Sequence, residues 1–106
     1  MLISTEADLT AAGLVLDAVA DPMRRRILTA LATEELCTTH LQAVLDAKQT
    51  LVSHHLRILR EAGLVQTSPC GRFTYYRLTP GALDGASTAL AQVAEASHRP
   101  PARRAC

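Results

Sequence analysis

The most constraining feature of the sequence is a change in the spacing of its apolar residues at Gly63. Over residues 49–62, Val52, Leu56 and Leu59 recur at helical intervals, which predicts an amphipathic helix. Gly63 predicts the end of this helix, because glycine readily takes the left-handed conformation of a C′ residue. Beyond it the residues favour strands, so the chain is expected to change from helix to sheet at this point.

Two short segments behind this helix, residues 64–68 and 72–78, are rich in strand-forming residues. The tripeptide between them, Pro69-Cys70-Gly71, is typical of a turn. Together they predict a two-stranded hairpin. Tyr75 and Tyr76 alternate along the second strand, so one is expected in the core and the other on the surface.

Helical patterns occupy the rest of the chain. Asp21 followed by Pro22 is a strong helix start, with the aspartate as N-cap and the proline at the first helical position. The sequence therefore predicts a mainly α domain with one β-hairpin, a winged helix-turn-helix. The domain is expected to span residues 1–98, followed by a flexible basic tail over residues 99–106. The remaining helices are expected at about Asp8–Val19, Pro22–Ala32, Leu36–Leu45 and, opened by Thr79-Pro80, up to Ser97.

The side of the predicted helix 49–62 that faces away from its apolar stripe carries hydrogen-bonding residues of medium reach. Such side chains suit base edges and phosphates in a DNA major groove about 12 Å wide. Lys48, at the helix start, can contact a phosphate. The segment is therefore predicted to read double-stranded DNA, with Leu51 either packed on a neighbouring helix or touching a thymine methyl group. The candidate reading residues are Gln49, Thr50, Ser53, His54, His55 and Arg57, the two histidines serving DNA contact or packing rather than metal.

The charge distribution agrees with a nucleic-acid partner. Residues 48–78 hold five basic side chains and one acid, Glu61, although the whole chain has a formal net charge of only +1. Such a basic segment is the electrostatic footprint of a nucleic-acid-binding face, although an ordinary solvated surface can show the same bias. Arg72 and Arg77 in the hairpin are expected to contact phosphates or the minor groove. The alternative is that the hairpin only caps the core.

Both terminal helices carry an apolar stripe on a chain of only 106 residues with three aromatic side chains. A core built from so few large residues is thin, and oligomerisation would stabilise it. The stripes bury either against each other or against a second copy. A homodimer is favoured, because DNA readers of this size usually match two half-sites. The stripes comprise Leu9, Ala12, Leu16 and Val19 in the first helix and Leu83, Ala86, Leu90 and Val93 in the last.

The segment between Val19 and Leu83 contains six short motifs, at residues 20–28, 35–37, 52–56, 59–65, 71–72 and 75–78. In this combination the chain resembles the ArsR/SmtB family of metal-responsive transcriptional repressors. The resemblance implies a homodimer that binds operator DNA when free of inducer. It also implies release of the DNA when a metal or metalloid binds.

The inducer expected from this resemblance depends on residues 35–41. The arsenic-sensing branch of the family has the pattern Glu-Leu-Cys-x-Cys-[Asp/His]-Leu, in which Cys37 matches the first cysteine and His40 the histidine variant. Thr39 stands where the second thiolate is expected. Trivalent arsenic prefers two or three soft thiolates, so Cys106 on the tail is the candidate for the missing one. On this interpretation the inducer is As(III) or Sb(III), bound by Cys37, His40 and Cys106.

Other interpretations of the cysteines stay open. Cys37 and His40 could hold a different metal, Cys37 and Cys106 could form a redox pair, or Cys37 could be a small buried side chain with Cys70 and Cys106 incidental. The second family site, at the start of the last helix, is not expected, because Pro80 and Ala82 take its leading places and His98 stands alone.

Two function classes other than DNA binding remain as alternatives. A winged-helix protein-interaction module fits the fold, but the polar face of helix 49–62 argues against it. A thiol enzyme could use Cys37 and His40, but the sequence shows no Gly-rich anion loop and no third orienting residue, so no catalytic residue is expected. The residues Met1–Ala7 lack the basic start of a signal peptide, and no apolar run could span a bilayer. A cytoplasmic protein with reduced thiols is therefore expected.

Overall fold

A computed structural model describes residues 6–106 of the chain, with side chains from residue 12 onward. Two predictions lie outside the described residues and side chains. They concern the signal-peptide region Met1–Ala7 and the side chain of Leu9. The fold is mainly α with a hairpin, as the sequence predicts. Its elements are α1 (Glu6–Ala20), α2 (Pro22–Leu31), β1 (Leu36–Cys37), α3 (Thr38–Leu45), α4 (Gln49–Glu61), β2 (Val65–Cys70), β3 (Phe73–Leu78) and α5 (Asp84–Ala96).

The start of α2 is capped as its sequence predicts. The Asp21 carboxylate accepts hydrogen bonds from the backbone N–H groups of Met23 at 2.8 Å and Arg24 at 3.1 Å. These two bonds satisfy donors that have no partner inside the helix. They also stabilise the charged carboxylate, so the pKa of Asp21 lies below its ordinary value, with the bond from the Arg24 backbone as the largest cause.

The sheet has three strands in the order β1-β3-β2, and not the two expected. Leu36 and Cys37, predicted to open the third helix, form β1 instead and pair antiparallel with Tyr76 and Tyr75 of β3. Their side chains are buried, at 7% and 5% exposure, so the pairing is supported by packing. A strand of two residues has no periodicity of its own, and only its neighbour in the fold defines it.

The hairpin turn is shorter than predicted. Pro69 and Cys70 belong to β2 and pair with Thr74 and Phe73, which leaves Gly71 and Arg72 as the turn. Gly71 has a φ of 60°, the conformation that the first residue of a type II′ hairpin turn requires. A proline is tolerated in β2 because this strand lies at the edge of the sheet.

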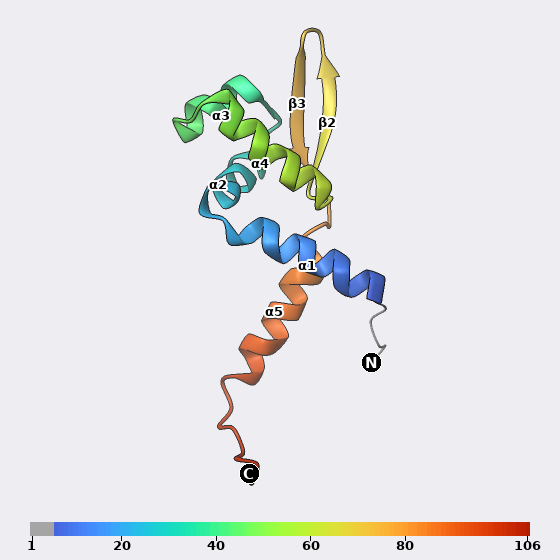
Figure 1. Ribbon diagram of the computed structural model, residues 1–106, viewed down its shortest axis with the longest axis vertical. Coiled ribbons are helices and arrows are strands. Elements are labelled where there is room, and N and C mark those ends of the chain that lie inside the picture. Colours follow the sequence, from blue (N-terminus) through green and yellow to red (C-terminus); the bar gives the residue numbers. More distant parts are fainter. Residues whose placement is uncertain (1–5) are drawn as a thin grey trace.

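The core is a set of aliphatic side chains from α1 to α4, from β1 and from residues 64–65 behind α4. Figure 1 shows these elements gathered at one end of the molecule, with the β2–β3 hairpin projecting beside them. α5 leads away to the opposite end, which gives the chain extents of 62 × 28 × 23 Å. The side chains with the smallest exposure are Ile27, Leu41, Val52, Leu56, Leu59 and Leu64.

The last helix begins at Asp84, four residues later than predicted. Gly81 has a φ of 78°, which a helix does not contain, and the Asp84 N–H donates to the Gly81 carbonyl to close a turn. Before this turn, the Thr79 N–H donates to the Leu64 carbonyl at 2.9 Å. The segment that follows β3 is therefore held at the base of the hairpin before α5 leads away.

The terminal helices pack on each other but leave apolar side chains exposed. α5 contains no buried residue, and Leu90 and Val93 are 56% and 69% exposed. In α1 the core takes Val15 and Ala18, whereas Leu16, a member of the predicted stripe, is 39% exposed. The face of α1 that is buried within the single chain therefore coincides only in part with the predicted stripe. Within the described part of the chain, no helix is long and apolar enough to cross a lipid bilayer.

Candidate nucleic-acid interface

α4 is held firmly by one face. Val52, Leu56 and Leu59 have exposures of 0%, 1% and 0%, as their spacing predicts. The turn before α4 is set by Asp46, whose φ of 50° is left-handed, a conformation that aspartate tolerates better than most residues. The helix then starts with the N–H groups of Leu51 and Val52 both donating to the Lys48 carbonyl at 3.1 Å.

The opposite face of α4 is open to solvent and polar. Five side chains predicted to read DNA line one shallow depression on it, and Lys48 is exposed beside them. Leu51, at 41% exposure, does not pack into the core. Because the buried face fixes the helix, these side chains are presented on a rigid surface. The five are Gln49, Thr50, Ser53, His54 and Arg57.

The hairpin brings a further cation to this surface. Arg72 in the turn and Gln49 and Ser53 of α4 line one groove of about 410 Å³, whose wall also includes Cys37. Figure 1 shows the hairpin standing beside α3 and α4, with its tip extending beyond them. Arg77 is exposed on β3 opposite Gln66 and does not line this groove. Of the two hairpin arginines, Arg72 is therefore the one that lies beside the α4 face.

His55 lies on the other side of α4, although it was among the candidate reading residues. Its side chain is only 7% exposed, and its Nδ1 lies 3.3 Å from Nη1 of Arg24. Burial lowers the pKa of His55 from its ordinary value of 6.5, and the charges of Arg24 and His54 add to this effect while Asp21 opposes it. A direct base contact needs an exposed side chain, so the reading face excludes His55.

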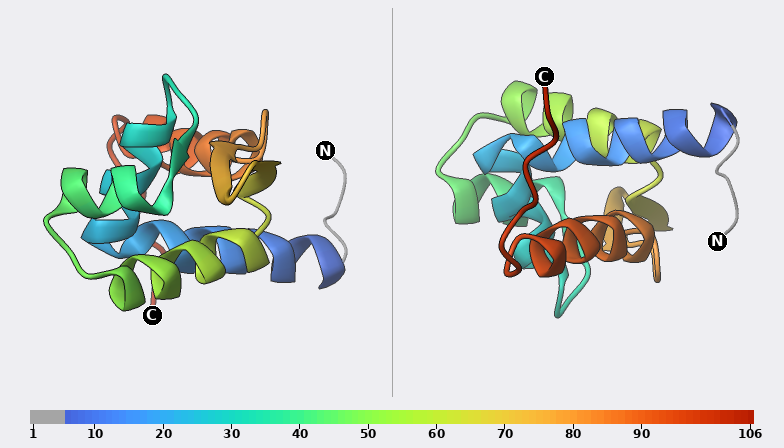
Figure 2. Two further views of the ribbon diagram at one scale, coloured as in Figure 1. Left: turned by 90° about the horizontal axis from the view of Figure 1, so that it is seen from above. Right: turned by 90° about the horizontal axis from the view of Figure 1, so that it is seen from below.

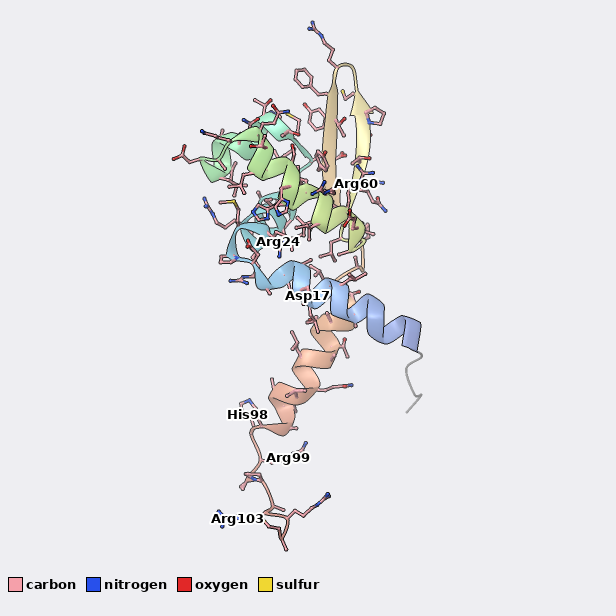
Figure 3. All side chains as sticks on the ribbon, viewed as in Figure 1. Asp17, Arg24, Arg60, His98, Arg99 and Arg103 are labelled. Atoms are coloured by element: carbon pink, nitrogen blue, oxygen red, sulfur yellow. The ribbon has the colours of Figure 1, made fainter. Side chains whose placement is uncertain are left out.

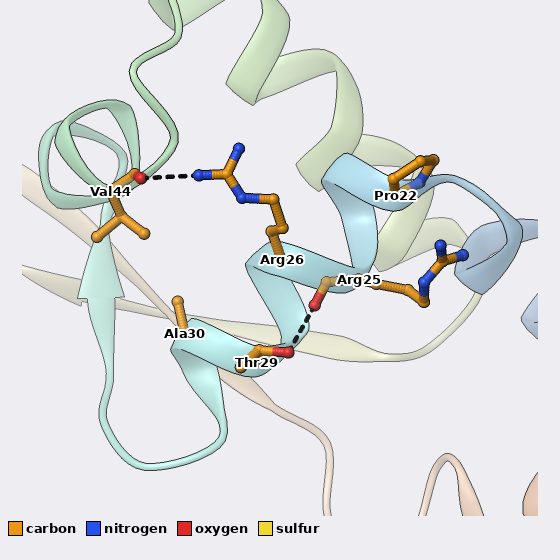
Figure 4. Close-up of a pocket in the computed structure, with 6 residues that line it drawn as sticks. All are labelled: Pro22, Arg25, Arg26, Thr29, Ala30 and Val44. Atoms are coloured by element: carbon orange, nitrogen blue, oxygen red, sulfur yellow. Dashed lines mark hydrogen bonds between the residues drawn. The ribbon is translucent and has the colours of Figure 1, made fainter.

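Three consecutive arginines, Arg24, Arg25 and Arg26, are structural in a way that the sequence did not reveal. Each donates to backbone carbonyls at the end of a neighbouring helix. Figure 4 shows Arg26 reaching the Val44 carbonyl of α3, with Arg25 beside it on the wall of a shallow pocket. Their guanidinium groups therefore bind the carbonyls at the ends of neighbouring helices, and a run of arginines gave no signal of which carbonyls they would meet.

Cys37 and His40 are brought together as their spacing predicts. Nδ1 of His40 accepts a hydrogen bond from the Cys37 N–H at 3.2 Å and lies 3.4 Å from the Cys37 Sγ. The His40 ring also packs edge-on against Tyr75, with ring centroids 6.0 Å apart. Tyr75 and Tyr76 are both half-buried; Tyr76 packs against the core, as alternation predicts for one of the two, and Tyr75 lies outside the core without being fully exposed.

The other two cysteines are not part of this pair within one chain. Cys70 is exposed at the end of β2, and Cys106 is exposed at the C-terminus, at the far end of the molecule from α3 (Figure 1). Among the residues that the structure describes, no three His, Cys, Asp or Glu side chains form a group able to hold a metal ion.

The sequence and the fold resemble those of known proteins. The sequence profile of the family described as "Bacterial regulatory protein, arsR family" matches residues 21–67. The chain is 48% identical over 61 residues to a "Transcriptional repressor SmtB homolog" of Synechocystis, covering 58% of this chain and 46% of that protein. It is 33% identical over 64 residues to the "Transcriptional repressor SdpR" of Bacillus subtilis, covering 60% of this chain and 71% of that one.

A solved structure gives the same result at the level of the fold. The crystal structure of a "Possible transcriptional regulator for arsenical resistance" superposes with a TM-score of 0.68 at 33% identity, covering 81% of this chain and 96% of the other. The chain spans about half the length of several curated relatives that it matches. The matching proteins are transcriptional regulators and not enzymes.

Proposed function

The chain belongs to the ArsR family of bacterial regulatory proteins, and from this premise we propose that it is a transcriptional repressor that binds operator DNA as a homodimer. The observation that carries the proposal is the polar, solvent-exposed face of α4, held rigid by the buried face behind it. A cytoplasmic location, where DNA and reduced thiols are both found, goes with this role.

In this proposal α4 enters the major groove. Gln49 and Arg57 have the side chains that form paired hydrogen bonds with base edges, and Thr50 and Ser53 bond to bases or phosphates. Lys48 at the helix start and Arg72 at the hairpin tip contact the DNA backbone on either side, which sets the register of the helix. Arg77 contributes positive charge from the base of the hairpin.

Exposed apolar side chains on the terminal helices support the homodimer. Leu14 and Leu16 of α1 and Leu90 and Val93 of α5 are all more than one third exposed. Burying such side chains against a second copy removes apolar surface from water. The dimer would then present two α4 helices, which suits two half-sites spaced about one DNA turn apart.

The DNA-binding proposal is tested with a duplex that the wild-type chain itself selects from a random library. Arg57→Ala and His54→Ala are expected to abolish selective binding in fluorescence anisotropy while the protein keeps its oligomeric state. Wild-type affinity should fall steeply with salt, because phosphate contacts release counterions. Arg103→Ala removes one positive charge at the other end of the molecule and serves as the matched control (Figure 3). If no duplex is enriched, or if binding is insensitive to salt, a protein-interaction module replaces this proposal.

We further propose that the inducer is trivalent arsenic or antimony. Cys37 and His40 give one thiolate and one imidazole, which by themselves do not fit trivalent arsenic, since it prefers two or three thiolates. The proposal therefore requires Cys106, contributed from the tail of the same chain or of the partner subunit. Support comes from the Cys37–His40 pair and from relatives named as regulators of arsenical resistance.

Thiol counting tests the inducer. Titration of the reduced protein with arsenite is expected to consume the thiols of Cys37 and Cys106 and to release the selected duplex. Cys37→Ser and Cys106→Ser should each prevent release, whereas Cys70→Ser, which removes the exposed thiol beside the hairpin turn, should respond like wild type. Release that persists in both of the first two variants, or a wild type that stays bound, would rule out this site and favour another inducer.

A further inference from the structure

Two arginines cap the end of α1. The last four carbonyls of a helix have no partner inside it. In α1 these belong to Asp17, Ala18, Val19 and Ala20, and all four accept hydrogen bonds from side chains of α2. Arg24 donates from Nε to the Ala18 carbonyl at 2.7 Å and from Nη2 to the Asp17 carbonyl at 3.2 Å. Nη1 of Arg25 donates to the Val19 and Ala20 carbonyls at 2.7 and 2.9 Å.

Arg24 has a second contact that Arg25 lacks. Its Nη1 lies 3.3 Å from Nδ1 of His55, which is buried on the inner side of α4. One planar guanidinium therefore touches the end of α1 with two of its nitrogens and α4 with the third. Figure 2 shows α1 and α4 running side by side, and Figure 3 places Arg24 of α2 near Asp17 of α1.

The contact requires that Nδ1 of His55 carries no proton. A guanidinium only donates hydrogen bonds, so the imidazole nitrogen facing it must accept. Protonation of His55 would place a second N–H, and a second positive charge, against Nη1. The ionisable groups around this ring are Arg24 and Asp21 from the start of α2 and His54 from α4 itself.

We propose that Arg24 is a positioning residue for DNA binding, which fixes the reading helix relative to α1 through its contact with neutral His55. This inference rests on the proposed DNA-binding function. The Arg24 side chain then connects the end of α1 directly to α4, the helix that carries the reading face. α1 also carries exposed apolar side chains. Any change in how α1 packs against a second copy is transmitted to α4 through this guanidinium. Acidification that protonates His55 breaks the link and lowers DNA affinity.

The first test compares Arg24→Gln with Arg25→Gln. Both remove one positive charge and two helix-capping bonds from the same end of α1, and only Arg24→Gln removes the contact with α4. With the duplex selected by the wild type, Arg24→Gln should weaken binding about tenfold or more, as expected for loss of a charged hydrogen bond. Arg25→Gln should change it less than about threefold. Equal losses would show that both arginines only cap α1 and would overturn the proposal.

The pH profile of DNA affinity separates positioning from a structural role. Wild type and His55→Gln share every other ionisable group, so the difference between their pH profiles isolates His55. Affinity of the wild type is expected to fall relative to His55→Gln as the pH drops below 6.5. Parallel profiles would contradict the role of His55.

A measurement without DNA keeps the proposal independent of the function proposed above. Hydrogen exchange of the α4 amides in the free protein should speed up in Arg24→Gln and not in Arg25→Gln, because only the former frees the helix. Arg24→Lys keeps the charge but loses the fork, so it should resemble Arg24→Gln. If the wild type selects no duplex at all, the proposed repressor function is wrong. The exchange result still shows whether Arg24 holds α4 in place. Unchanged exchange in Arg24→Gln would refute the link itself.

Discussion

α4 and α5 have the same length and opposite surroundings. Each has 13 residues, and each carries apolar residues at helical spacing. α4 buries Val52, Leu56 and Leu59 almost completely, whereas α5 buries no residue and leaves Leu90 and Val93 more than half exposed. Equal patterns therefore lead to unequal burial. One helix is positioned by its own chain, and the other leaves its apolar face exposed in the single chain.

The difference also separates two kinds of function. A reading helix needs a fixed orientation, because base contacts tolerate little displacement, and α4 has that orientation without any partner. A dimerisation helix needs an exposed apolar face, and α5 has one. The following predictions test this division, from the largest expected effect to the smallest.

The largest effect is expected from truncation inside the α4 anchor. Leu56→Ala removes a side chain that is 1% exposed, so the free energy of unfolding should fall by about 2–5 kcal/mol. Leu51→Ala, in the same helix at 41% exposure, is the control and should stay within about 0.5 kcal/mol. Urea unfolding at a fixed protein concentration measures both. Similar losses in the two variants would mean that α4 is not anchored by one face.

A charge on the exposed face of α5 should affect assembly and leave the fold intact. Val93→Glu would bury a carboxylate in the proposed dimer interface, so the dissociation constant of the dimer should rise about a hundredfold. Gln92→Glu introduces the same charge one position away and should have a much smaller effect. Analytical ultracentrifugation measures the dimer, and circular dichroism checks the helix content. If Val93→Glu remains as dimeric as wild type, α5 is not the interface.

Two glycines provide a smaller test at the level of the backbone. Gly63 ends α4 with a φ of 77°, and an added Cβ there would meet no atom within 4 Å, so only the conformation is strained. Gly63→Ala should therefore destabilise the fold by about 1–2 kcal/mol. Gly85 lies in α5 with equally open space, and Gly85→Ala should stabilise it by about 0.5–1 kcal/mol through helix propensity. Thermal unfolding should show shifts of opposite sign; shifts in the same direction would contradict this account.

The smallest effect is a pH dependence of stability from His55. Its pKa in the folded chain lies below the 6.5 of the unfolded chain, so between these two values the unfolded chain binds more protons. Stability is then complete above pH 6.5 and declines as the pH falls toward the lowered pKa. His55→Gln should remove this slope. Urea unfolding between pH 5 and 7.5 measures the slope, and a slope retained in His55→Gln would assign it to another group.

Much of the fold followed from local patterns. The Asp21–Pro22 start of α2, the Gly63 end of α4 and the buried stripe of α4 were all predicted and are observed, because caps and periodicity involve residues close in sequence. The proximity of Cys37 to His40 was predicted for the same reason. β1 was missed, since two residues form a strand only when β3 lies beside them.

The candidate site divides in the same way. Gln49, Thr50, Ser53, His54 and Arg57 could be assigned to one open face by helical spacing alone, and the structure places them together. His55 was grouped with them because histidine is compatible with both DNA contact and packing. In the structure His55 is buried and contacts Arg24, which is 31 residues away in sequence.

The sequence by itself determined which segment is helix, where that helix begins and ends, and which of its faces is apolar, because these properties depend on neighbours within about one turn. Only the tertiary structure decided that Arg24 and Arg25 cap the end of α1, that His55 faces inward, and that the apolar face of α5 remains exposed. These depend on where separate helices meet. A guanidinium finds its acceptor, and an apolar stripe its cover, only when packing has brought distant residues together.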